Sequence, residues 1–161
     1  MTNALLYRMP AGIPGAISRA QQATVDPVVF NASKPFTKYG RFGKTVAGAF
    51  EPLESGDAAA VITGVLVRPY PTTSSQDGLG TSTPPASGVG DRLKRGYISA
   101  RLNQGTAAKD AQVYVRTTAD TGKLVGDIET AADSGACVAV VGCFFTGAAD
   151  ADGNVELAFN I

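Results

Sequence analysis

Histidine and tryptophan are absent from this chain of 161 residues, and cysteine occurs only twice. Without histidine, the chain lacks the commonest general base and the commonest metal ligand of proteins. Nucleophile systems in which histidine activates a serine or a cysteine are therefore excluded. No pair of acidic residues is singled out as a catalytic couple. We expect a protein that is not an enzyme and that needs neither a cofactor nor a metal ion.

The two cysteines, Cys137 and Cys143, lie in one apolar run at 136–145. If that run is a strand, its rise of about 3.3 Å per residue places them roughly 20 Å apart. A disulfide needs Cα atoms within about 7 Å, so both cysteines are expected to be reduced core residues. Reduced cysteines are typical of proteins made in a reducing compartment.

Charge is also scarce, because only 17% of the residues are charged and 14 basic residues balance 14 acidic ones. A formal net charge of zero lacks the basic surface typical of nucleic-acid binders. A neutral surface with few charges favours self-association and protein partners. No apolar stretch reaches the roughly 18 residues of a membrane-spanning helix, and the first ten residues lack the features of a signal peptide. We therefore expect neither nucleic acid nor membrane as a partner.

Short apolar runs separated by turn signals dominate residues 24–161, which is typical of an all-β sandwich or small barrel. The run at 136–145 is expected to be buried throughout, with a bulge at Gly142. In the final run, Val155, Leu157, Phe159 and Ile161 are expected to share one buried face. The expected strands are 24–30, 45–50, 60–68, 94–102, 112–116, 136–145 and 155–161.

The segment DADGN, Asp150–Asn154, has oxygen-bearing side chains at alternate positions, as a calcium loop does. Its glycine falls at position four instead of six, and no acidic residue stands at position twelve. Asp-Gly between two alternating runs is a strong hairpin signal, so we interpret the segment as a turn.

Residues 1–23 form an expected N-terminal arm that precedes a single β-domain at 24–161. Met9, Ile13 and Ile17 have helical spacing, but Pro10 and Pro14 prevent a helix through them. An apolar segment without a regular structure of its own indicates that a partner completes it, with packing along its own β-domain as the alternative. The candidate contact residues of the arm are Tyr7, Arg8, Met9, Pro10, Ile13, Pro14 and Ile17.

A second irregular segment spans residues 70–92, where 15 of 23 residues are Gly, Pro, Ser or Thr. A loop of that length in a compact domain is usually functional or disordered. We interpret it as a projecting loop that leads into a small basic cluster, for which a solvated strand start is the alternative. The candidate contact residues here are Tyr70, Leu79, Arg92, Lys94 and Arg95.

Several longer phrases occur together in a fixed order. They are GIPGAISR at 12–19, TVDPVVFNASKPFTKYG at 24–40, GVLVRPYPT at 64–72, LKRGYISARLN at 93–103, GTAAKDAQVYVR at 105–116 and FFTGAADADGNVELAFNI at 144–161. Through these phrases the chain resembles the structural cement, or head decoration, proteins of tailed bacteriophages. The resemblance covers nearly the whole chain and is weakest at 41–60 and 76–87.

The resemblance implies a non-enzymatic protein that binds the outer surface of a phage head and bridges major capsid subunits to stabilise the shell. It implies an all-β, jelly-roll-like sandwich or barrel, made and assembled in the bacterial host cytoplasm. The implied partners are the major capsid protein and the chain itself, with a homodimer favoured and a trimer possible. A ligand- or carbohydrate-binding β-sandwich on a virion is the alternative, but it would need exposed aromatic side chains, and the chain has five tyrosines and no tryptophan.

Overall fold

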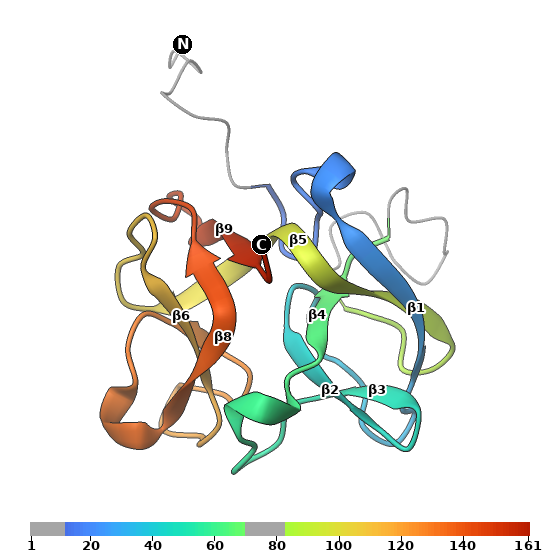
Figure 1. The fold of residues 1–161 in the computed structure, drawn as a ribbon. Coiled ribbons are helices and arrows are strands. Elements are labelled where there is room, and N and C mark those ends of the chain that lie inside the picture. Colours follow the sequence, from blue (N-terminus) through green and yellow to red (C-terminus); the bar gives the residue numbers. More distant parts are fainter. Residues whose placement is uncertain (1–11, 70–82) are drawn as a thin grey trace.

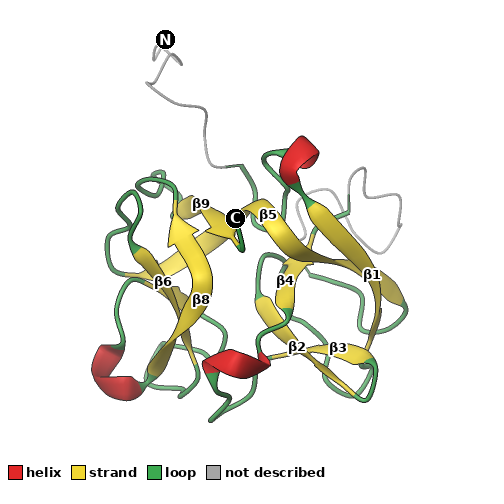
Figure 2. Ribbon diagram, in the orientation of Figure 1, coloured by secondary structure: helices red, strands yellow, loops and turns green. Residues whose placement is uncertain are grey.

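The structure is a computed structural model, and it describes residues 12–69 and 83–161. Strands dominate these residues, and the helices are single 3-10 turns (Figure 1, Figure 2). The strands are β1 (Thr24–Phe30), β2 (Phe42–Val46), β3 (Ala49–Pro52), β4 (Gly64–Val67), β5 (Val89–Gln104), β6 (Gln112–Arg116), β7 (Ile128–Glu129), β8 (Cys137–Phe145) and β9 (Asn154–Phe159); the helices are η1 (Ala20–Gln22), η2 (Ala59–Val61) and η3 (Asp133–Gly135). None of the described helices is long and apolar enough to cross a membrane. The prediction of an all-β fold is confirmed.

Two rings of hydrogen-bonded strands make up the fold, and the long strand β5 belongs to both. In the first ring, β1, β3, β2 and β4 follow one another, and both β4 and β1 pair with the first half of β5. In the second ring, β7, β6, β8 and β9 follow one another, and both β7 and β9 pair with the second half of β5. Figure 1 shows the rings as two lobes joined by β5. The pairings are barrel-like, and a jelly-roll order stays an expectation from the resemblance.

Gly96 marks the point at which β5 passes from one ring to the other. Pairing with β1 ends at Arg95, and pairing with β9 begins at Gly96. Gly96 has a φ of +136°, a conformation that costs a glycine little and that other residues rarely adopt. A Cβ at this position would also lie 2.9 Å from the Ala23 backbone. The sequence therefore places a glycine where the shared strand has to bend.

The main apolar core lies in the second ring and extends to the side of the first ring that faces it. Phe42 of β2 and Phe159 of β9 meet edge to face across this boundary, with ring centroids 5.9 Å apart. Val113 and Val115 of β6 point into the core and are fully buried, as their alternation predicts. The two rings consequently share one core.

A smaller aromatic cluster fills the first ring. Its buried members are Phe30, Phe36, Tyr39, Phe50 and Leu66. Two glycines, Gly43 on β2 and Gly90 on β5, make room for it. A Cβ at Gly43 would lie 2.6 Å from the ring of Phe50, and one at Gly90 would lie 2.1 Å from the ring of Phe30. All five strands of the ring therefore contribute a side chain or a glycine to this interior.

The expected single strand at 45–50 is wrong, because the chain reverses there. Ala47 and Gly48 have φ values of 49° and 85°, and they form the turn of an antiparallel hairpin between β2 and β3. Two central residues with positive φ are typical of the tight turns that join paired strands. The sequence concealed this turn because alanine rarely adopts a positive φ.

The expectation of burial throughout 136–145 is also wrong, although the bulge at Gly142 is confirmed by its φ of 66° and by a break in the register with β6. Val141 is 76% exposed and Phe144 is 43% exposed, so β8 has one face toward solvent. Ile161, expected on the buried face of β9, is 57% exposed because β9 ends at Phe159.

A fully buried arginine holds the outer part of the second ring together. Arg116 of β6 donates to both carboxylate oxygens of Glu129 on β7, at 2.5 and 3.1 Å, and also contacts Asp133 of η3. Hydrogen bonding to Glu129 raises the pKa of Arg116, so the guanidinium stays charged. Lys123 reaches Asp133 from the more exposed side at 2.6 Å.

We expect Gly90→Ala to lower the free energy of unfolding by about 1–3 kcal/mol, because the added methyl group overpacks the first ring against Phe30. Urea denaturation measures this change. Phe30→Leu removes the ring atom that clashes, so the double variant should lose less than the sum of the two single losses. Strictly additive losses would show that the two positions do not compete for the same space.

Arg116→Met should cost about 3 kcal/mol or more, because it leaves Glu129 buried without its partner. Lys123→Met removes the same charge from the exposed end of the same network and should cost less than about 1 kcal/mol. Thermal and urea unfolding of the two variants give the comparison. Similar small losses in both would contradict a structural role for the buried pair.

Candidate interaction surface

The described end of the arm, residues 12–19, lies against the β-domain between the end of β4 and the middle of β5. The backbone N–H of Gly15 donates to the carbonyl of Ser99, and the carbonyl of Gly15 accepts from the N–H of Arg68, both at 2.8 Å. Ile17 continues this pairing as an antiparallel bridge with Ile98. This part of the arm therefore has a structure within its own chain. Tyr7, Arg8, Met9 and Pro10 lie outside the described residues.

Gly15 allows the arm to approach this closely. Its φ is +89°, and a Cβ there would lie 2.6 Å from the Cβ of Tyr39 and 3.0 Å from the backbone nitrogen of Arg68. Any other residue would need both a strained backbone and a displaced neighbour. Ile13 and Pro14, which precede it, are held at fixed places on the surface as a result.

A polar anchor follows at the end of the arm. Arg19 donates to both carboxylate oxygens of Glu156 on β9, at 3.2 and 2.8 Å, and its guanidinium lies 3.9 Å over the ring of Tyr97. Ser18 and Thr146 donate to the same carboxylate at 2.5 and 2.7 Å. Burial alone would raise the pKa of Glu156, but the hydrogen bonds from Arg19, Ser18 and Thr146 outweigh it and lower that pKa. We call this contact the arm anchor.

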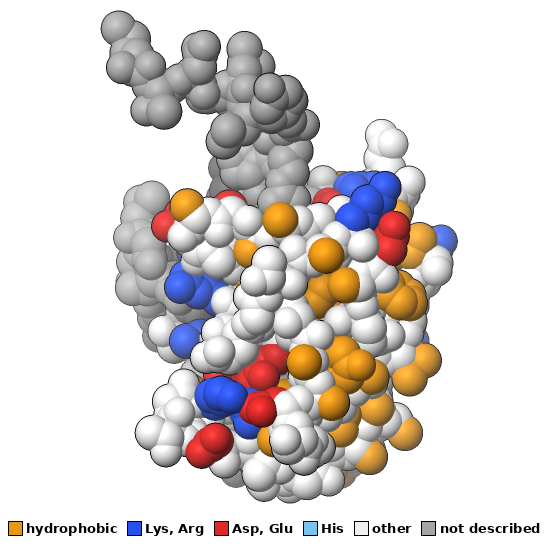
Figure 3. Space-filling view, turned by 90° about the vertical axis from the view of Figure 1, so that its left-hand side faces the viewer, with side chains coloured by type: hydrophobic (Ala, Val, Ile, Leu, Met, Phe, Trp, Pro, Cys, Tyr) orange, Lys and Arg blue, Asp and Glu red, His pale blue; other side chains and the backbone are white. Residues whose placement is uncertain are grey.

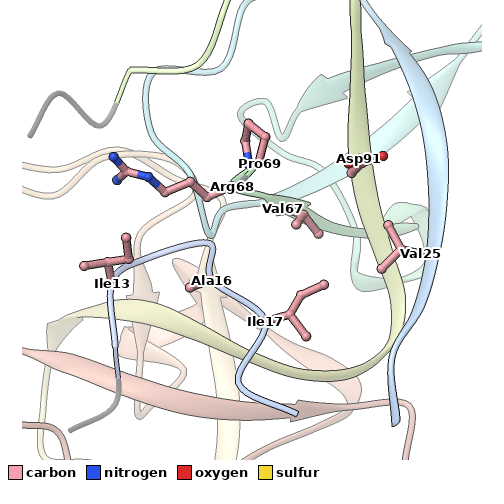
Figure 4. Close-up of a pocket in the computed structure, with 8 residues that line it drawn as sticks. All are labelled: Ile13, Ala16, Ile17, Val25, Val67, Arg68, Pro69 and Asp91. Atoms are coloured by element: carbon pink, nitrogen blue, oxygen red, sulfur yellow. The ribbon is translucent and has the colours of Figure 1, made fainter. Parts of the chain in front are cut away.

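An apolar groove of about 370 Å³ opens beside the arm (Figure 4). Ile17 of the arm, Val25 of β1 and Val67 of β4 come together in it from three parts of the chain. Ile13 also lines the groove and is half exposed. The backbone contacts of the arm therefore create a hollow with an apolar lining and an open side.

Exposed valines continue from this groove along β1. Val25 and Val29 are exposed on the same side of the strand, and Val29 pairs with Val89 of β5, which is also exposed. On the other side, Val29 pairs with Ala49, whose partner on β2 is the exposed Val46. Paired residues share a face, so these side chains form one surface, the β1 apolar strip of Val25, Val29, Val46 and Val89. Adjoining exposed apolar groups of this kind are typical of interaction surfaces.

The second ring carries a separate apolar area. Figure 3 faces this ring and shows hydrophobic side chains gathered on one side of the view, next to a small group of charged side chains. Val141 and Phe144 of β8 are the large apolar residues of this ring's described strands that are exposed.

The predicted basic cluster divides between the interior and the surface. Arg92 donates to Asp26 at 3.1 Å and to the hydroxyl of Thr45 at 2.8 Å, so its charge has an internal partner. Lys94 is 52% exposed and lies 3.4 Å from Asp26. Arg95 is exposed and forms no ion pair among the described residues. Tyr70 and Leu79 of the loop lie outside the described residues.

The roots of the arm and of the loop meet at one place. The loop leaves the described chain after Pro69, next to Arg68, and Arg68 is hydrogen-bonded to Gly15 of the arm. Two segments that the sequence separates by some fifty residues thus begin side by side. Their shared root, the groove and the β1 apolar strip form the candidate interaction surface. The sequence did not predict the groove or the strip, although Val25 and Val29 belong to the expected strand at 24–30.

The segment DADGN and the two cysteines have structural roles outside the candidate surface. Asp150 accepts the backbone N–H groups of Asp152 and Asn154, so DADGN is the predicted turn. No group of three metal-ligand residues occurs within the described ranges. Both cysteines are free and buried, as predicted. Burial raises the pKa of the Cys137 thiol to about 11 and raises that of Cys143 as well, so both stay protonated and unreactive.

Comparison with known proteins gives the family. The family model for the XM1 gp53 minor capsid protein matches residues 1–159. A solved structure described as "The capsid of Myoviridae Phage XM1" contains a chain with the same fold, with a TM-score of 0.70 at 20% identity over 99% of this chain and 97% of that chain. Comparison with curated proteins finds no match. The resemblance to phage head proteins is thereby confirmed, and the chain belongs to the XM1 gp53 minor capsid protein family, a family of structural capsid proteins.

Proposed function

We propose that this protein is a capsid cement that binds the outer surface of a phage head, bridges neighbouring major capsid subunits and stabilises the shell without enzymatic activity. The observation that carries the proposal is the shared root of the arm and the loop, fixed by the hydrogen bond from Arg68 to Gly15 at 2.8 Å. Because the arm and the loop start at one point of a rigid domain, both can contact the same partner surface. The family match supplies the capsid as that surface.

The partner that we assign to the groove and the β1 apolar strip is the major capsid protein. The strip is continuous with the groove through Val25, so the arm and the strip offer one extended apolar contact. Such a contact can be weak for each subunit and still hold firmly when several are made together, because later contacts form at a high effective concentration. Association of the chain with itself, as a homodimer in preference to a trimer, would raise the number of contacts further.

The contacts of residues 12–19 lower the cost of this binding. Fixing a flexible backbone costs about 1–2 kcal/mol per residue. Residues 12–19 already hold their conformation through Gly15, Ile17 and the arm anchor. These residues would therefore add little further ordering cost on binding, which favours affinity through preorganisation.

No observation favours the carbohydrate-binding alternative. Tyr39 is buried, and Tyr97 and Tyr114 are only partly exposed, so none of the described tyrosines offers an open stacking face. Specific binding on a glycan array would be the observation in favour of carbohydrate binding.

Heads assembled without this protein should bind the purified chain and gain resistance to heat and osmotic shock. Co-sedimentation measures binding, and cryo-electron microscopy of the decorated heads shows whether the chain lies outside and between capsid subunits. Density at an internal position, or decorated heads no more resistant than bare ones, would refute the cement role.

Removal of residues 1–11 should leave the β-domain folded, because the contacts of Gly15, Ile17 and Arg19 with the domain are kept. Head binding should weaken by about tenfold or more, which corresponds to about 1.4 kcal/mol. Circular dichroism and thermal unfolding confirm the fold, and co-sedimentation measures the affinity. If the shortened chain binds heads as the full chain does, the arm has no part in the contact.

Glu156→Gln should loosen the arm while the rest of the fold stays intact, because it removes the charge that Arg19 meets. The pKa of Glu156 is lowered in the folded chain, so its stabilising effect is complete above the ordinary value of 4.5 and is lost as pH falls through the lowered value. Amide exchange protection of Ser18 should therefore fall in the variant at neutral pH and in the unmodified chain at acidic pH. The control is Asp152→Asn, an exposed acid in the nearby turn. Equal protection in all three chains would show that the anchor does not hold the arm.

A further inference from the structure

A second hollow, of about 420 Å³, lies on the other side of the arm root, between the segment that precedes β2 and the second half of β5. Five basic or carboxamide side chains line it beside Tyr39, and none of the residues that line it is acidic. They are Lys38, Arg41, Arg101, Asn103 and Asn154. Pro14 of the arm forms part of the same wall. The hollow therefore combines three cations and two carboxamides at the junction of the two rings and the arm.

Two of these cations lack the acidic partner that most others in the chain have. Within residues 12–69 and 83–161, Lys38 and Arg101 are exposed and form no ion pair, and only Arg95 and Lys109 share that state. Most of the other described basic side chains are paired with carboxylates of the same chain. Two unpaired cations that converge on one hollow leave it with an uncompensated positive charge.

The third cation, Arg41, is only partly satisfied. Its Nη2 lies 2.7 Å from Oδ1 of Asp127, which links the first ring to the segment before β7. Its Nη1 is buried and has no hydrogen-bond partner within residues 12–69 and 83–161. A buried donor without an acceptor is unfavourable, so the guanidinium of Arg41 is not fully satisfied by Asp127 alone.

The two carboxamides add neutral donors. Oδ1 of Asn103 accepts the backbone N–H of Ile128 at 3.1 Å, which orients the amide and leaves its NH₂ group without a partner among the described residues. The NH₂ group of Asn154 donates to Asp150 at 3.2 Å and retains a second N–H. Among the described residues, Asp127 lies 2.7 Å from Arg41 and Asp150 accepts from Asn154 at 3.2 Å, so the uncompensated positive charge of the hollow comes from Lys38 and Arg101.

We propose that this hollow is a binding site for a carboxylate, presented by an acidic segment of a protein in the capsid. Arginine forks match the planar, two-oxygen geometry of a carboxylate. A nucleic-acid backbone is disfavoured, because the chain has a formal net charge of zero and this cluster is too small to follow a polyanion. The identity of the partner rests on the proposed function, whereas the chemistry of the site rests on the residues that line it.

The site is tested on heads with three matched single variants. Lys38→Gln and Arg101→Gln should each weaken head binding by roughly fivefold or more and reduce its dependence on salt. The control is Lys109→Gln, which removes an exposed, unpaired lysine outside the hollow and should bind within about twofold of the unmodified chain. If Lys38→Gln and Lys109→Gln behave alike, the hollow does not bind the partner.

The ligand chemistry is tested separately by NMR on the purified full chain. An end-capped peptide with one Glu should shift the side-chain amide signals of Asn103 and Asn154, while the same peptide with Gln should not. Sodium phosphate serves as the free-anion probe. Equal shifts with the Gln peptide, or shifts with phosphate alone, would overturn the carboxylate site.

The two experiments separate the two proposals. If the unmodified chain does not bind heads, but the Glu peptide shifts its Asn103 and Asn154 amide signals, the cement role is refuted and the carboxylate site is supported. If the unmodified chain binds heads, and Lys38→Gln and Arg101→Gln bind them equally well, the carboxylate site is refuted and the cement role is supported.

Discussion

The strand β5 is the constraint on which the rest of the structure depends. It supplies hydrogen-bonding edges to β1 and β4 in its first half and to β7 and β9 in its second half, so neither ring closes without it. Because side chains alternate along a strand, a slip of one residue in β5 would turn the buried faces of both rings outward at once. Gly96, with its φ of +136°, lies where the pairing of β5 with β1 ends and its pairing with β9 begins.

The candidate interaction surface is organised around the same strand. The arm pairs with β5 through Ser99 and Ile98, and the segment that returns from the loop leads into β5 at Val89. Any force applied to the arm or to the loop is therefore transmitted to a strand that belongs to both rings and to the shared core. For a protein proposed to hold shell subunits together, such an attachment resists local peeling better than attachment to an edge strand would.

The sequence predicted those parts of the fold that depend on local alternation. The runs at 112–116 and 155–159 alternate clearly, and their inward residues are buried. The sequence did not predict the first residues of β5, because Val89 and Gly90 follow a Gly-, Pro- and Ser-rich segment that is typical of a loop. The exposure of Val141 could not be predicted from an apolar run, since apolar residues on both faces carry no signal about which face is covered.

The candidate site was less predictable, because its contacts join residues far apart in the chain. The pairs Arg92–Asp26 and Arg19–Glu156 bring together residues that no local pattern connects. The arm itself was recognisable from its prolines and apolar residues. The conformation of residues 12–19 depends on Gly15 fitting between Tyr39 and Arg68, a fit that exists only once the first ring has closed.

On the proposed function, the arm root lies between an apolar groove and a cationic hollow, so a partner must match both chemistries at once. With a net charge of zero there is little long-range attraction to recruit that partner, and selectivity has to come from these short-range contacts.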